Sequence, residues 1–447
     1  MEFDVNLYVQ LSLLMFFEFA VWGAWCPVLA ARCLGPLKMT GKQTGWIYAT
    51  LPLASMITPI IAGWLSDSQI DAKWLMAGCH LVGAILLFVA AKQQKFWGLF
   101  FAMFGWSLCY AATLPLVNKL LLAHHVDGGF GMGGVFIWAP VAWALVGYLL
   151  AGLRNLRKVE GGGGDCLVLA AVASLIMFAC CLIQPITPFA KGTNILDALA
   201  LFEIPSFVVF MAVMLVVAGM QQFYFLGSAP FMQDIGIKGK NVSAVMAIAQ
   251  AVQALATWFL LERFFGTANE QGVFEPGMLG PTVTLAVGAF CWAFLFLVYV
   301  RSKSPGLIIP VQAFHGFAYV FFIIAGQIYT GTIAPPEMAG SAQGMIFFVQ
   351  AGLSLFLCTQ LAGVVMDKCS AGGKFQWSKI FAVPLVCAVV GAVVLLAGMK
   401  DPESGKQNAD KPAVEKTEIE KAEEELPRLT VTLPGSDDAK KDAAETD

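Results

Sequence analysis

The strongest constraint on the fold of this chain is a series of apolar runs, each about as long as a lipid bilayer is thick. A helix of about 20 apolar residues crosses a hydrocarbon core about 30 Å thick. Windows of that length predict twelve membrane helices along the chain. Their expected ranges are 8–30, 43–65, 73–92, 96–118, 132–153, 166–185, 205–228, 241–262, 278–300, 307–330, 340–366 and 379–399.

The distribution of charge supports a membrane protein. Only 13% of the residues are charged and the mean hydropathy is +0.73, whereas soluble domains carry about 25% charged residues. The first 400 residues hold 36 charged side chains, and the segment after Lys400 holds 14 acidic and 7 basic ones. We expect that segment, 400–447, to be a disordered charged tail. The net charge of −3 gives no indication of nucleic-acid binding.

The longest polar interruption divides the expected helices into two groups of six. Two six-helix halves with a site between them at the middle of the bilayer are a common transporter design. We therefore predict an all-α membrane protein with an N-terminal half at 1–185, a central loop at 186–204 and a C-terminal half at 205–399.

Basic residues in the loops bear on the orientation of the chain. If both termini lie inside the cell, the inner loops hold four basic residues and the outer loops hold fifteen. The positive-inside rule therefore favours termini outside. Because acidic Glu2 and Asp4 precede the first apolar run, we expect that run to be retained as a membrane helix and not removed as a signal peptide.

Sequence patterns typical of enzymes and ATP-driven pumps are not found. The chain has no GxxxxGK[ST] loop and no HExxH pattern, and its eleven cysteines show no metal-ligand spacing. We therefore expect neither enzymatic activity nor a bound metal or cofactor. A secondary transporter for a small polar solute is the leading hypothesis. A membrane sensor that signals through the charged tail is the alternative from another class.

Glu18 is the membrane-embedded acid that most needs an explanation. It lies in the first apolar run between Phe17 and Phe19, where an ionisable group costs about 2.5–3.5 kcal/mol. No residue three or four positions away in its own helix pairs with it, so its partner must be another helix, a substrate, water or a proton. Glu18 is thus a candidate for proton coupling or substrate binding, with a structural hydrogen bond to another helix as the alternative.

Further polar side chains lie inside the expected C-terminal spans. His315 has aromatic neighbours and suits a ring-shaped polar ligand, although a hydrogen-bonded core histidine is the alternative. We interpret His80, in the third run, as structural. Gln221, Gln250 and Gln253 are expected to line a polar pocket, with interhelical packing as the alternative. Gln250 and Gln253 are three positions apart and share a helix face.

Several segments resemble a known family. The turn from Gly63 to Asp67 resembles the GxxxD conformational loop motif of the major facilitator superfamily. Six further segments resemble the nucleoside:proton symporter branch of that superfamily, namely Phe16–Trp25 (FFEFAVWGAW), Ala72–Ala91, Tyr110–Asn118 (YAATLPLVN), Ile137-Trp138, Leu199–Phe202 and Ser341–Met345. The resemblance implies the major facilitator fold in the inner (plasma) membrane, cytoplasmic termini, alternating access and nucleoside uptake driven by protons. We expect the transporter to act as a monomer in the lipid bilayer.

Site residues carried over from this family give a mixed picture. Gln221 and Gln250 match polar positions around the nucleoside, and Tyr319 matches an aromatic position. The sequence departs from the family pattern at Phe136 (an arginine), Val320 (an aspartate), Gln253 (a glutamate), Tyr224 (an asparagine), His315 (an aromatic residue) and Glu18 (a glutamine). The predicted solute contacts are Gln221, Tyr224, Gln250, Gln253, His315, Tyr319 and Phe136. Either Glu18 has taken over proton coupling, or the protein carries another metabolite, such as a sugar or nucleobase, without coupling.

Overall fold

Membrane-length helices dominate the protein. The computed structural model describes residues 3–124, 132–160, 162–187, 195–268, 274–334 and 339–401. Within these ranges, twelve helical stretches are long and apolar enough to cross a membrane, and each overlaps one predicted range. The prediction of twelve spans is therefore confirmed, whereas the predicted tail beyond residue 401 lies outside the described residues.

The first six spans are built from interrupted and continuous helices. They comprise α1 (Val5–Trp25), α2 (Leu29–Leu34), α3 (Gly41–Ser55), α4 (Thr58–Ser68), α5 (Ala72–Lys92), α6 (Phe96–His124), α7 (Met132–Phe136), α8 (Trp138–Leu156) and α9 (Asp165–Leu182). Pro27 separates α1 from α2, because proline has no N–H for the helical hydrogen-bond ladder. Thr40 begins α3 with a capping box to Gln43, which satisfies two backbone N–H groups.

The last six spans follow the short helix η1 (Ile195–Glu203). They comprise α10 (Pro205–Asp234), η2 (Gly239–Asn241), α11 (Val242–Phe259), α12 (Leu261–Phe265), α13 (Gly280–Arg301), α14 (Pro305–Ile308), α15 (Gln312–Ala318), η3 (Tyr319–Ile324), α16 (Ala325–Ile333), α17 (Ala339–Phe347), η5 (Phe348–Ser354), α18 (Leu355–Lys368) and α19 (Trp377–Gly398). The segments η3 and η5 are π-helical turns within the tenth and eleventh spans.

Two short hairpins complete the described structure. Strands β1 (Gly266–Ala268) and β2 (Phe274–Pro276) pair antiparallel, as do β3 (Ser370–Ala371) and β4 (Lys374–Phe375). Gly372 and Gly373 connect β3 to β4 with φ angles of 59° and 75°. A two-residue turn with positive φ at both positions favours glycine and matches the twist of a hairpin.

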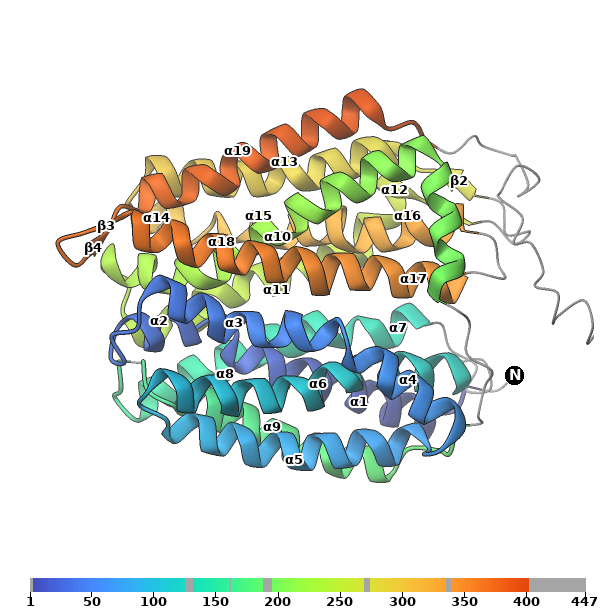
Figure 1. Cartoon of the computed structure of the whole chain (residues 1–447), viewed down its shortest axis with the longest axis horizontal. Helices are drawn as coiled ribbons and strands as arrows, with labels where there is room; N and C mark the ends of the chain where they lie inside the picture. Colours follow the sequence, from blue (N-terminus) through green and yellow to red (C-terminus); the bar gives the residue numbers. More distant parts are fainter. Residues whose placement is uncertain are drawn as a thin grey trace, which may run out of the picture. The chain divides into compact units, whose positions relative to one another are not determined.

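Helices of each half pack mainly on one another, with a smaller interface between the halves (Figure 1). In the first half α5 packs on α6 and α9, and α1 packs on α8 and α9. In the second half α19 packs on α10 and α13, and α15 packs on α11 and α13. Between the halves α3 packs on α18, and α8 packs on α11. The predicted limits of the halves and the central loop stay predictions.

The halves are joined at the end of the bundle where α1 ends and α3 begins. The Asp367 carboxylate accepts hydrogen bonds from the backbone N–H groups of Gly41 at 2.6 Å and Lys42 at 2.9 Å. At the same end, the Asn155 amide donates to Asn241 Oδ1 at 3.1 Å. These are the hydrogen bonds that join the two halves among the described residues. These contacts close the bundle at the end where α1 ends and α3 begins. The start of α1 and the end of α19 lie at the opposite end (Figure 1).

Candidate functional site

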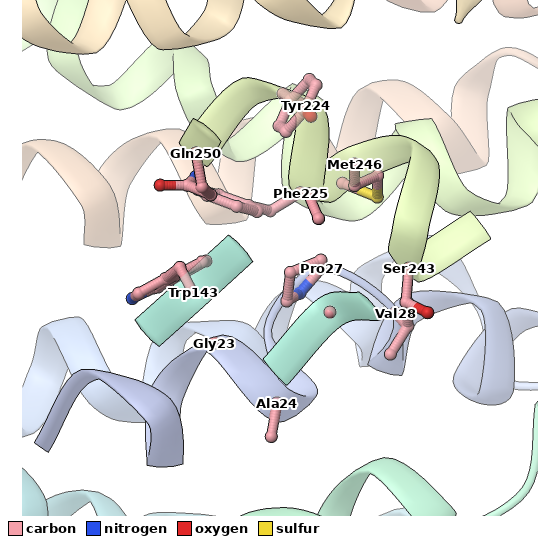
Figure 2. A pocket seen from close by; sticks show the side chains of 12 residues that line it. Gly23, Ala24, Pro27, Val28, Trp143, Tyr224, Phe225, Ser243, Met246 and Gln250 are labelled. Atoms are coloured by element: carbon pink, nitrogen blue, oxygen red, sulfur yellow. The ribbon is translucent and has the colours of Figure 1, made fainter. Parts of the chain in front are cut away.

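A pocket with aromatic and polar walls lies between the two halves (Figure 2). The first half contributes Trp143 on α8, and the second half contributes Tyr224 and Phe225 on α10. Ser243 and Gln250, both on α11, supply a hydroxyl and an amide to the same pocket. Such a mixture of aromatic surface and a few polar groups is typical of small-molecule sites.

The pocket is narrow in this closed arrangement. Its cavity volume is about 10 Å³, which is room for about one water molecule. Close contact between the halves causes this, because α8 approaches α11 so tightly that a Cβ at Gly147 would lie 2.9 Å from Ala247 Cβ and 3.0 Å from the backbone oxygen of Ser243. Any larger ligand therefore requires the halves to move apart.

Tyr224 is held in place by two side chains of α15. Its ring stacks on the imidazole of His315, with centroids 3.9 Å apart and an interplanar angle of 10°. Its hydroxyl donates to Gln312 Oε1 at 2.9 Å. Because Gln312 and His315 are three positions apart, they lie on one face of α15 and reach the same ring. The pocket wall formed by Tyr224 is thus fixed by residues behind it.

The hydrogen bonds of His315 define its tautomer. The indole Nε1–H of Trp292 donates to His315 Nδ1 at 3.1 Å. Indole nitrogen is only a donor, so Nδ1 is the acceptor and the hydrogen of the neutral imidazole is on Nε2. His315 Nε2 is buried and has no hydrogen-bond partner in the described part of the chain. A free donor is therefore present directly behind Tyr224.

Replacing Gln312 with leucine is expected to lower the melting temperature of the protein. The buried amide bonds Tyr224 and also the hydroxyl of Tyr299, at 2.8 Å from Nε2. Its loss leaves two buried hydroxyls to find other partners, at a cost of about 1–3 kcal/mol. Thermal unfolding of detergent-purified protein measures the change, and Gln69→Leu, at an exposed glutamine, is the control. Equal melting temperatures for the two variants would contradict the role given to Gln312.

The other predicted solute contacts lie in different surroundings. Gln250 lines the pocket, whereas the Gln221 amide donates to Ala218 O in its own helix at 2.9 Å. Gln253 is buried one turn beyond Gln250, and Tyr319 begins the π-helical turn η3. Phe136 ends α7, next to a separate apolar cluster of the first half. The structure thus brings together Tyr224, His315 and Gln250.

Glu18 lies inside the first half and not on the pocket. Its side chain is fully buried, and its Oε2 is 2.9 Å from Nε2 of His80 on α5. The partner required by the sequence argument is therefore the histidine that we interpreted as structural. Of the predicted loop motif, Gly63 lies within α4, whereas the Asp67 side chain lies outside the described residues.

Sequence reasoning missed several residues of this site, among them Trp143, Phe225, Ser243 and Gln312. Trp143 is in the middle of the predicted span 132–153, where the usual explanation of tryptophan as an interfacial anchor does not apply. The central position of Trp143 in that span could therefore have identified it as a candidate pocket residue. Gln312 was one of many intramembrane amides, and only the fold places it against Tyr224.

Twelve spans in two six-helix halves with a pocket between them are the architecture of the major facilitator fold. The model of the nucleoside H+ symporter family matches residues 5–404 of the chain. The chain therefore belongs to the nucleoside H+ symporter family, and it is a multi-pass membrane transporter and not an enzyme.

Individual relatives agree with this assignment. The chain is 26% identical over 419 residues to the nucleoside permease NupG of Escherichia coli (strain K12), covering 89% of this chain and 96% of the permease. It is 25% identical over 433 residues to the xanthosine permease of the same organism, covering 91% and 99%. The crystal structure of the nucleoside transporter NupG superposes with a TM-score of 0.73 at 24% identity, covering 88% of this chain and 99% of that one, which supports the fold.

Proposed function

We propose that this protein imports nucleosides together with protons by alternating access. The observation that carries the proposal is the pocket between the halves, which has Trp143, Tyr224 and Phe225 as aromatic walls and Gln250 as its amide. Aromatic rings stack on flat bases, at about 1–3 kcal/mol per base, and an amide matches the paired donors and acceptors of a base edge. Nucleoside and xanthosine permeases among the relatives support the same substrate class.

The solute contacts that we propose include residues beyond this narrow pocket. Gln250 and Tyr224 would touch the solute first, and His315 would offer its free Nε2–H once Tyr224 moves aside. Gln221, Gln253, Tyr319 and Phe136 are proposed contacts of the opened state. Glu18 is the proposed proton-coupling residue, because the family's charged positions are Phe136, Val320 and Gln253 in this chain.

We further propose an inner-membrane monomer with cytoplasmic termini. In that orientation the closed end, with Asp367 and Gly41, faces outward, and the opposite end releases solute into the cell. The loop charges argue for the reverse orientation, so the proposal relies on the family resemblance. Protease accessibility of the 402–447 segment in sealed inside-out vesicles tests it, with cleavage expected.

Uptake of labelled uridine and xanthosine into liposomes that contain the purified protein tests the function. With a more alkaline interior, the wild type is expected to accumulate nucleoside above its external concentration, and a proton ionophore should abolish the accumulation. Gln250→Leu should weaken apparent affinity by about two- to tenfold, the equivalent of one hydrogen bond of about 0.5–1.5 kcal/mol. Gln69→Leu is the matched control at an exposed glutamine.

Two results would contradict the proposal in different ways. Saturable uptake of a sugar or a free nucleobase, with none of any nucleoside, would replace the substrate class. Nucleoside uptake that never exceeds equilibrium and ignores the pH difference would indicate a facilitator without proton coupling.

A further inference from the structure

Glu18 and His80 form a buried pair of titratable side chains at the centre of the first half. Four helices contribute to it, because Glu18 lies on α1, His80 on α5, Thr113 on α6 and Ser174 on α9. All four side chains are at most 2% exposed. Glu18 Oε2 is 2.9 Å from His80 Nε2, and Thr113 Oγ1 donates to Glu18 Oε1 at 2.7 Å.

Both hydroxyls of this cluster have two possible partners. Thr113 Oγ1 lies 2.7 Å from Glu18 Oε1 and also 2.7 Å from the backbone oxygen of Tyr110. Ser174 Oγ lies 2.9 Å from the backbone oxygen of His80 and 3.2 Å from its Nδ1. A hydroxyl has one hydrogen to donate, so each can serve only one of its acceptors at a time.

This arrangement accommodates two protonation states of the pair. In the protonated state Ser174 donates to the His80 backbone oxygen and accepts from Nδ1–H, and one proton lies between Glu18 Oε2 and His80 Nε2. The pair is then neutral overall. When the Nδ1 proton leaves to water, Ser174 turns to donate to Nδ1, the hydrogen between the two residues stays on Nε2 and bonds the Glu18 carboxylate, and Thr113 donates to Oε1. The pair then carries one negative charge, and every polar atom still has a partner.

The surroundings of the pair supply few groups that could balance the negative charge left after proton release. Within 4.0 Å of the Glu18 carboxylate, the described residues supply one basic group, that of His80. The other titratable groups that face it are Cys79 on α5, Tyr110 on α6 and Cys181 on α9. Arg154 on α8 is paired with Asp165. A buried charge without a counter-ion is costly, and among the described residues His80 is the basic group that lies against the carboxylate.

A short chain of contacts connects the pair to the pocket. The Tyr110 hydroxyl donates to the backbone oxygen of Glu18 at 2.8 Å. The ring of Trp22, one turn further along α1, contacts Tyr110 and Trp143 with centroids 6.2 and 5.5 Å apart. Trp143 is itself a wall of the pocket. A shift of α1 that accompanies proton release would therefore reach the solute site.

We propose that Glu18 and His80 together form the proton-binding site of this transporter, inside the first half and separate from the solute pocket. The proposal rests on proton-coupled nucleoside import. It adds His80 as an obligatory partner and Thr113 and Ser174 as hydroxyls that adjust to either state.

The test compares accumulation with exchange in the same liposomes. A pH difference of about two units drives roughly 100-fold accumulation when one proton accompanies each solute, since each unit is worth a factor of about ten. Glu18→Gln and His80→Gln should each lose this accumulation and still exchange internal for external nucleoside when no gradient is imposed. Glu18→Asp, which keeps a carboxylate, should keep part of the accumulation. Glu203→Gln, at an exposed glutamate, should behave as wild type.

Separate outcomes decide the two proposals. Absence of nucleoside exchange by the wild type would contradict nucleoside transport itself. Wild-type accumulation by a folded Glu18→Gln or His80→Gln variant would overturn the proton site. Loss of exchange together with accumulation, in a variant that elutes and melts like the wild type, would also overturn it, because a separate proton site leaves exchange intact. If a glutamine variant does not fold, Thr113→Val and Ser174→Ala replace it, with reduced accumulation and intact exchange expected.

Discussion

Asp367→Ala is expected to open the closed end of the transporter. The carboxylate accepts two hydrogen bonds from Gly41 and Lys42, the first residues of α3 in the other half. Hydrogen bonds to a charged group are worth about 1.5–3 kcal/mol, and a negative charge at a helix N-terminus adds about 0.3–1 kcal/mol. Because every 1.4 kcal/mol is a factor of ten, the population closed at this end should fall about tenfold or more relative to the open one.

Amide hydrogen exchange measures this shift without any labelling site. Exchange should become faster at residues 41–45 and, because the whole interface separates, also at residues 242–247 of α11. Asp4→Ala is the matched control, since Asp4 also accepts two helix N–H groups, those of Asn6 and Leu7, but within α1 alone. Unchanged exchange at 242–247 in the Asp367 variant would contradict a role in joining the halves.

Gly316→Leu is expected to prevent the second half from folding. Helix α15 approaches α11 so closely at this residue that an added Cβ would lie 2.2 Å from the backbone oxygen of Ala249 and 2.9 Å from the backbone nitrogen of Gln253. Overpacking costs about 1–3 kcal/mol even where side chains can adjust, and here the obstacle is backbone. The two helices must separate, which removes His315 from behind Tyr224.

Gel filtration of detergent extracts reports the outcome as the yield of monodisperse protein. Gly316→Leu should give little or none, and Gly316→Ala should already reduce it. Gly78→Leu is the control, because a Cβ at Gly78 would meet nothing within 4 Å. A wild-type yield from Gly316→Leu would show that the contact between α15 and α11 is not required.

The membrane spans were predictable because each helix must be long enough to cross the hydrocarbon core of the bilayer. Each spanning helix must satisfy its own backbone groups, so length and apolarity suffice to find it. The interruptions were harder. Pro27 signals the break between α1 and α2, but the π-helical turn η3 within the predicted range 307–330 has no comparable signal in the sequence. A π turn depends on how neighbouring helices pack and not on one residue type.

The candidate site was predictable only in part, for a similar reason. The cost of a charge in hydrocarbon singled out Glu18, yet its partner His80 is 62 positions away, and only the packing of α1 on its neighbours joins them. Gln221 and Gln250 looked alike as intramembrane amides. In the structure the Gln221 amide donates to a carbonyl of its own helix, whereas Gln250 lines the pocket. A sequence lists polar groups, and tertiary contacts decide which of them a ligand can reach.

The two π-helical turns have a consequence for the direction of side chains. Each turn contains one residue more than an α-helix would need there, which rotates everything beyond it by about 100° around the helix axis. Gln312 precedes η3 and Gln327 follows it. A helical wheel with 3.6 residues per turn therefore places these two side chains on the wrong faces of the span relative to each other. The residues beyond η3 and η5 therefore lie on faces of the tenth and eleventh spans that an uninterrupted α-helix would not give them.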